Sequence, residues 1–105
     1  MMDATAFRCH DTAVAKGFWD YPEYTPDVLL AKLALVHSEL SEILEAYRKS
    51  KGTIALTEEF ADTIIRLLDL WAAMHEIGIV DSLDDALVAK MAVNTTRPHK
   101  HGNLI

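Results

Sequence analysis

The chain has little of several residue types, and each shortage excludes a class of protein. Cys9 is the only cysteine among 105 residues, so neither an internal disulfide nor a thiolate zinc cluster can form. No apolar run approaches the roughly 20 residues of a membrane span. The N-terminal segment also lacks the apolar stretch of a signal peptide. We therefore expect a protein of a reducing cytoplasm that does not enter a membrane.

Basic residues are also scarce. The chain has 10 Lys and Arg against 16 Asp and Glu, and its formal net charge is -6. A protein that coats a nucleic acid polymer needs a basic surface, so we expect no such partner. The charge is distributed unevenly along the chain. All the acidic residues lie in residues 1–85, whereas the charged residues of 86–105 are Lys90, Arg97 and Lys100. Such a chain can still bind phosphates if a cation bridges its carboxylates to them.

The apolar content is high for so short a chain. Half of the residues are hydrophobic, at 50%, whereas a chain of this length buries only about 60–65% of its unfolded surface on folding. Apolar faces are left over, and a partner subunit is the simplest way to cover them. The length suits one domain, spanning residues 1–105.

Four segments are predicted to be helical, and no strand-like alternation is present. They start at the capping residues Asp3, Thr25, Thr57 and Ser82. They end, in the same order, at Lys16, at Lys49, before Gly78 and before Pro98. In the second and third segments apolar residues recur at steps of three and four. We therefore predict an all-α fold with an antiparallel four-helix bundle-type core, completed by oligomerisation.

Two pairs of carboxylates lie in the second and third predicted helices. Glu39 and Glu42 form an E-x-x-E pair, and Glu59 and Asp62 form an E-x-x-D pair. Residues three apart on a helix are neighbours, so four carboxylates can converge if the two helices pack side by side. Glu39 lies within an apolar stripe, where an uncompensated charge is costly. Oxygen ligands favour a hard divalent cation, chiefly Mg²⁺, with Mn²⁺ as the second choice.

Each acid pair has a simpler interpretation as part of a solvated helix face. Glu45 and Glu58 extend the acidic rows, and we interpret them as solvated rather than as ligands. Asp69 follows Arg66 by one turn, and we expect these two to form an ion pair. A ferritin-like di-iron site would need Glu-x-x-His motifs, and no Glu of the chain has a His three residues later.

The basic tail places three phosphate-binding residue types on one helical face. Lys90, Asn94 and Arg97 are spaced by four and three residues. An ammonium, an amide and a guanidinium in this arrangement can bind phosphates. The alternative is a solvated helix end whose cations favour the helix dipole.

Three segments, HSELSEILEAYRK (37–49), EEFADTIIRLLDL (58–70) and KMAVNTTRPHKHG (90–102), resemble the MazG-like, all-α nucleoside triphosphate pyrophosphohydrolases. The signature of that family is E-x-x-E followed by E-x-x-D, and here 16 residues separate Glu42 from Glu59. KGFWD (16–20) also resembles the aromatic segment before the family's second helix. The resemblance covers nearly the whole chain, and its specificity lies in the order and spacing of the motifs.

The resemblance implies an activity and a set of site residues. The activity is Mg²⁺-dependent hydrolysis of (deoxy)nucleoside triphosphates to monophosphate and pyrophosphate, a house-cleaning reaction of the nucleotide pool. Homodimers or homotetramers with sites formed between subunits are also implied. The implied metal ligands are Glu39, Glu42, Glu59 and Asp62. The implied substrate-binding residues are Lys16, Trp19, Lys90, Asn94 and Arg97.

A carboxylate outside direct ligation could act as general base for the attacking water, and both Glu39 and Glu42 are candidates. Two other functions stay open. One is a non-catalytic helical module that binds a nucleotide or a partner. The other is a structural oligomer in which Glu39 pairs with a base such as Lys32 or Arg66. The accepted base and sugar and the number of metal ions are not determined by the sequence.

Overall fold

A computed structural model describes residues 1–99, and these fold into four α-helices. In chain order they are α1 (Met2–Ala15), α2 (Pro26–Arg48), α3 (Thr53–Glu76) and α4 (Leu83–Thr96). The described residues contain no strand, so the predicted all-α class is confirmed. Lys100 and the last part of the tail motif lie outside the described residues.

Two of the predicted helix caps are present. Thr25 Oγ1 accepts a hydrogen bond from the Val28 backbone N–H, and Pro26 occupies the first helical position of α2. Ser82 Oγ accepts from the Asp85 backbone N–H at the start of α4. The helix ends predicted from local chemistry are therefore confirmed at these two positions.

The other two helices begin earlier than predicted. α3 starts at Thr53, because Gly52 adopts a φ of 98° and turns the chain directly into the helix. The Thr57 hydroxyl, expected to cap α3, instead donates to the Thr53 carbonyl within the helix. α1 starts at Met2.

Asp3 joins α1 to α4 instead of capping its own helix. Its carboxylate accepts hydrogen bonds from the Ser82 hydroxyl and from the Asp84 backbone N–H. In return, the Asp84 carboxylate accepts from the backbone N–H groups of Met2 and Asp3. Each helix N-terminus thus receives a carboxylate from the other helix, where the positive end of the helix dipole favours it.

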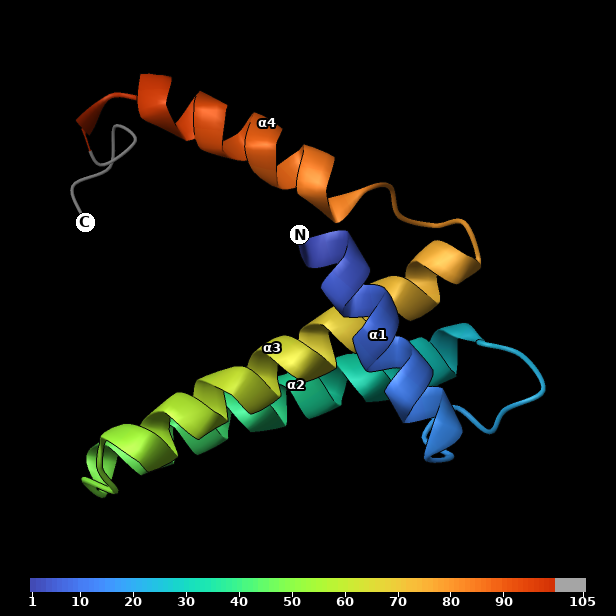
Figure 1. Ribbon diagram of the computed structural model, residues 1–105, viewed down its shortest axis with the longest axis horizontal. Coiled ribbons are helices and arrows are strands. Elements are labelled where there is room, and N and C mark those ends of the chain that lie inside the picture. Colours follow the sequence, from blue (N-terminus) through green and yellow to red (C-terminus); the bar gives the residue numbers. More distant parts are fainter. Residues whose placement is uncertain (100–105) are drawn as a thin grey trace.

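The body of the molecule is an antiparallel pair, α2 and α3, crossed by α1 (Figure 1). One core cluster lies among these three helices and the segment before α2, and a second lies between α1 and α3. The first contains Trp19, Leu29, Val36, Leu70 and Ala73. The second contains Ala6, Leu68 and Ala72.

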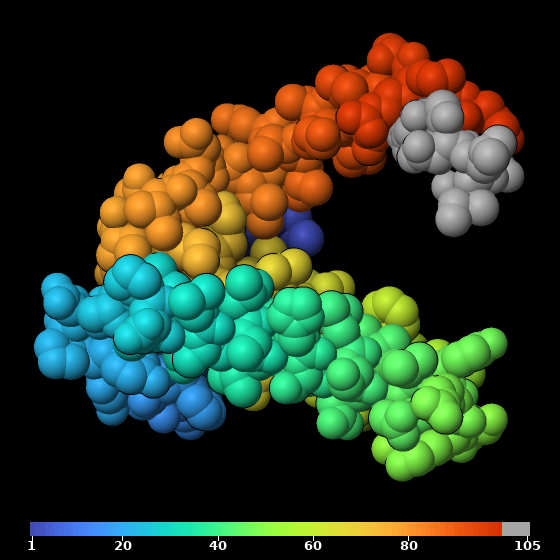
Figure 2. Space-filling view, turned by 180° about the vertical axis from the view of Figure 1, so that it is seen from behind, coloured from blue at the N-terminus to red at the C-terminus, as the bar shows by residue number. Residues whose placement is uncertain are grey.

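Only α4 stands apart from this body. Among the helices its backbone lies close to α1 alone, only its first residue, Leu83, packs against the second core cluster, and it contains no buried residue. Figures 1 and 2 show it starting near the N-terminus of α1 and extending over α2 and α3 while remaining separate from them. Within residues 1–99 of a single copy, therefore, the four helices do not close into a bundle.

Several apolar residues that recur at steps of three and four on α2 and α3 are also exposed. Leu40, Leu44, Tyr47, Phe60 and Ile64 are each 47–73% exposed. Leu40, Leu44, Tyr47 and Phe60 line a shallow apolar groove near the α2–α3 turn. Contiguous exposed apolar surface of this kind is typical of protein–protein contact sites.

Candidate metal centre

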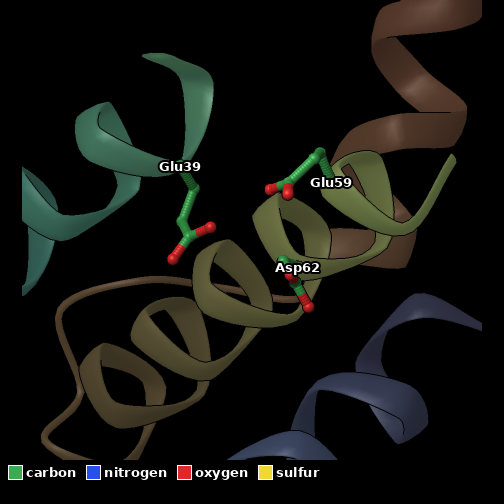
Figure 3. A group of neighbouring side chains, drawn as sticks. All are labelled: Glu39, Glu59 and Asp62. Atoms are coloured by element: carbon green, nitrogen blue, oxygen red, sulfur yellow. The ribbon is translucent and has the colours of Figure 1, made fainter. Parts of the chain in front are cut away.

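Three of the four predicted carboxylates come together between α2 and α3. Glu39 on α2 and Glu59 and Asp62 on α3 each place one oxygen within 4.8 Å of the others (Figure 3). Glu39 and Glu59 are partly buried, whereas Asp62 is exposed. Because α2 and α3 pack side by side, two acid pairs 16 residues apart in the sequence contribute to one cluster.

Glu42, the fourth predicted ligand, is exposed and lies outside this group. An α-helix turns about 100° per residue, so a side chain three residues after Glu39 points about 60° away from it. Glu39 faces α3, and the rotation carries Glu42 toward solvent on the same flank. Glu42 therefore lies one turn along α2 from Glu39 and outside the cluster.

Arg66 neutralises part of the negative charge of the cluster. Its Nε donates to Glu39 Oε1 over 2.6 Å, and the side chains of Arg66 and Glu39 are 42% and 17% exposed. The predicted ion pair between Arg66 and Asp69 is wrong, because Arg66 points to α2. The contact between Glu39 and Arg66 is the one that the structural-oligomer alternative requires.

Asp69 instead holds a buried network together. It accepts a hydrogen bond from His10 Nδ1 over 2.7 Å, and its two oxygens lie 2.9 and 3.1 Å from Trp19 Nε1. His10 is 7% exposed, and its Nε2 has no hydrogen-bond partner, although Glu76 Oε2 lies 3.4 Å away. These contacts fix α1 and the segment before α2 against α3.

A cavity of about 530 Å³ opens next to the carboxylates, between α1, α2 and α3. Glu39 and Asp62 line it, so the cluster lies at its edge. Four cationic side chains also line the cavity: Arg8, Lys16, Lys32 and Arg66. The cavity thus combines a negative edge with several positive groups, which suits a polyanion bound together with a cation.

Lys16 and Trp19 were both predicted to bind the substrate. Lys16 lines the cavity, and Trp19 does not. Trp19 is 4% exposed and belongs to the core, where its ring packs against Tyr24. The aromatic side chain that does line the cavity is its neighbour Phe18, which is 57% exposed.

Lys32 connects α2 to the aromatic segment. Its Nζ donates to the Phe18 carbonyl and lies 4.6 Å from the centre of the Trp19 ring. Burial lowers the pKa of Lys32, and nearby Arg66 lowers it further, while Asp69 opposes both. The charge of Lys32 is therefore affected by both Asp69 and Arg66, and the effect of Asp69 is the larger.

The tail residues are placed away from this cavity. Lys90 and Asn94 lie on α4, and Arg97 follows its last turn. All three are exposed, and none lines the cavity. A single copy therefore does not bring the predicted phosphate-binding residues to the carboxylates.

Lys32, Arg66 and Arg8 line the cavity but were not predicted to bind substrate. For two of them the spacing in the sequence gave an indication. Lys32 precedes Glu39 by seven residues, and Arg66 follows Glu59 by seven, so each lies two helical turns away on the same face. Arg8 carried no such signal, because its place depends on how α1 crosses α3.

Comparisons with protein-family models, with curated proteins and with solved structures found no match for this chain. Among the helices of residues 1–99, none combines the length and the apolar character that crossing a bilayer requires.

Proposed function

We propose that the protein is a Mg²⁺-dependent nucleoside triphosphate pyrophosphohydrolase that releases nucleoside monophosphate and pyrophosphate. One observation carries the proposal: carboxylates from two helices converge within 4.8 Å at the edge of a cavity that cationic side chains line. This is the arrangement that the resemblance to the MazG-like enzymes requires. Hydrolysis of (deoxy)nucleoside triphosphates in the cytoplasm would serve to clean the nucleotide pool.

The donor set suits a hard cation. Glu39, Glu59 and Asp62 offer only carboxylate oxygens, which Mg²⁺ prefers and Mn²⁺ accepts. Three converging carboxylates with a single arginine beside them also leave a surplus of negative charge that a divalent cation would offset. These three residues would hold the metal, and Glu42 lies outside the group.

Side chains at the site would supply a base, a phosphate-binding group and a stacking surface for the hydrolysis. A divalent cation held by these carboxylates would offset the charge of the triphosphate and lower the pKa of a water. Of the two candidate bases, Glu42 is exposed and lies outside the cluster, whereas Glu39 is tied to Arg66. Glu42 is therefore the better placed to take the proton of the attacking water. Lys16 would bind the phosphates, and the exposed ring of Phe18 offers a face on which a base can stack.

A second copy of the chain would complete the site. α4 has no buried residue, and the apolar groove of α2 and α3 is open. A homodimer or homotetramer would cover both surfaces. The same assembly would allow Lys90, Asn94 and Arg97 of one copy to reach the triphosphate in the cavity of another.

The ion pair between Glu39 and Arg66 favours a second candidate, a structural or non-catalytic helical module that binds a nucleotide or a partner. In that case Arg66 alone balances Glu39, and the other acids are solvated. The two candidates differ in whether the cluster binds a divalent cation at all.

Incubation with a panel of nucleoside triphosphates and Mg²⁺, with separation of the products, tests the proposal. We expect monophosphate and pyrophosphate from the wild type, and loss of most activity in Glu59→Gln and Asp62→Asn. Glu58→Gln is the matched control, because Glu58 is an exposed acid next to Glu59 that lies outside the cluster. Release of diphosphate and orthophosphate, or equal activity in Glu58→Gln and Glu59→Gln, would contradict the assignment.

A further inference from the structure

Arg66 lies where the carboxylate cluster needs a positive charge. Its Nε is 2.6 Å from Glu39 Oε1, and Glu39 also places an oxygen within 4.8 Å of Glu59 and Asp62. Arg66 follows Asp62 by four residues and therefore projects from the same face of α3, one turn along. A divalent cation bound by the cluster would compete with Arg66 for Glu39.

Arg66 has room to move if it loses Glu39. Its side chain is 42% exposed and lines the cavity. It is a long side chain on a rigid helix, so rotation about its own bonds can carry the guanidinium from α2 into the cavity. No backbone movement of α3 is required.

The cavity favours an anion at the point that the guanidinium would reach. Arg8, Lys16 and Lys32 line the same cavity, and Asp69, an acid that also lines it, is held by His10 and Trp19. The positive charge of Arg66 lowers the pKa of Lys32, although Asp69 raises it by more. A phosphate among these cations would relieve their mutual repulsion, and a guanidinium binds phosphate oxygens in a bidentate manner.

We infer that Arg66 exchanges partners during substrate binding. Without a divalent cation it holds Glu39 in place and prevents repulsion within the cluster. When a cation takes the Glu39 carboxylate, Arg66 turns into the cavity and binds the triphosphate. This inference rests on the proposed function, and it adds a substrate-binding residue that lies outside the E-x-x-E, E-x-x-D and tail motifs.

The partner exchange predicts opposite effects of one substitution on two ligands. In Arg66→Gln the competitor for Glu39 is gone, so Mg²⁺ alone should bind about two- to fivefold more tightly, the range expected for a partly exposed ion pair. Inorganic tripolyphosphate, measured with saturating Mg²⁺, should bind at least about tenfold more weakly, because a charge-assisted contact is lost. Isothermal titration calorimetry measures both constants, and circular dichroism verifies that the helices are intact.

Two further variants control the experiment. Arg66→Lys keeps the positive charge and should restore most of the competition with Mg²⁺, but only part of the tripolyphosphate affinity, since lysine cannot bind in a bidentate manner. Arg48→Gln removes an arginine of α2 that is 68% exposed and pairs with Glu45 outside the cavity. It should leave both constants unchanged.

The outcomes separate this inference from the proposed function. A wild type that binds Mg²⁺, with an Arg66→Gln variant that changes neither constant or weakens both, overturns the partner exchange and leaves the proposed function standing. A wild type that neither binds Mg²⁺ nor hydrolyses any triphosphate overturns both. Tighter Mg²⁺ binding together with weaker tripolyphosphate binding supports the exchange.

Discussion

Removal of one charge from the carboxylate cluster should stabilise the protein when no metal is present. In Glu59→Gln the side chain keeps its size but loses its repulsion with Glu39 and Asp62, whose nearest oxygens lie within 4.8 Å. At that distance two unit charges repel by about 1 kcal/mol in water and by about 3.5 kcal/mol at an effective dielectric constant of 20. The cluster lies at an open edge and Arg66 already offsets Glu39, so we take the lower figure.

A gain of about 1 kcal/mol raises the melting temperature of a domain of this size by about 4–8 °C. Differential scanning calorimetry without and with Mg²⁺ measures the effect. The wild type should gain stability when Mg²⁺ is added, because the ion binds the folded state, whereas Glu59→Gln should gain much less. Without Mg²⁺ the variant should therefore have the higher melting temperature. On addition of Mg²⁺ the melting temperature of the wild type should rise by more than that of the variant.

Glu58→Gln is the control for the loss of charge on α3. Glu58 is exposed and outside the cluster, so its substitution should shift the melting temperature by less than half as much. If Glu58→Gln and Glu59→Gln had the same melting temperature and the same response to Mg²⁺, the carboxylates would not act as a cluster. The electrostatic basis of the proposed site would then be refuted.

Two other predictions concern the contacts that hold α1. Asp69→Asn should lower the free energy of unfolding by about 1.5–3 kcal/mol in urea titrations, because the partly buried carboxylate accepts hydrogen bonds from His10 and Trp19; a loss no larger than that of the exposed control Asp11→Asn would contradict the network. Hydrogen bonds from Ser82, Asp84 and Leu83 outweigh the desolvation of Asp3 and hold its pKa below the ordinary value of 3.8. Asp3 therefore stabilises the folded state above that pH, and this contribution is lost as the pH falls through the lowered pKa. The difference in unfolding free energy between wild type and Asp3→Asn should be present at pH 7 and shrink below about pH 3.8; an equal difference at pH 7 and at pH 2 would contradict this role.

The site illustrates how strongly helix rotation affects prediction. Spacing alone treats Glu39 and Glu42 as equivalent, since both belong to one E-x-x-E motif. In the structure Glu39 faces α3 and pairs with Arg66, whereas Glu42 is exposed. The direction in which α2 turns its faces is set by burial of Leu29 and Val36 in the core, and that packing places Glu39 between the helices.

The aromatic segment before α2 shows the same limit. The order Phe18, Trp19 does not indicate which ring is buried. Trp19 enters the core, where its indole N–H finds an acceptor in the partly buried Asp69, 50 residues later in the chain. Phe18 lies at the cavity wall and is 57% exposed.

Local chemistry in the sequence was sufficient to determine the four helices and the caps at Thr25 and Ser82. Those features depend on residues within one or two turns of each other, and the sequence displays such neighbours directly. Only the tertiary structure decided that Arg66 pairs with Glu39 across 27 residues, that α1 supplies Arg8 and Lys16 to the cavity, and that α4 stands apart. These outcomes depend on how whole helices rotate and cross to bury their apolar faces, which no single segment specifies.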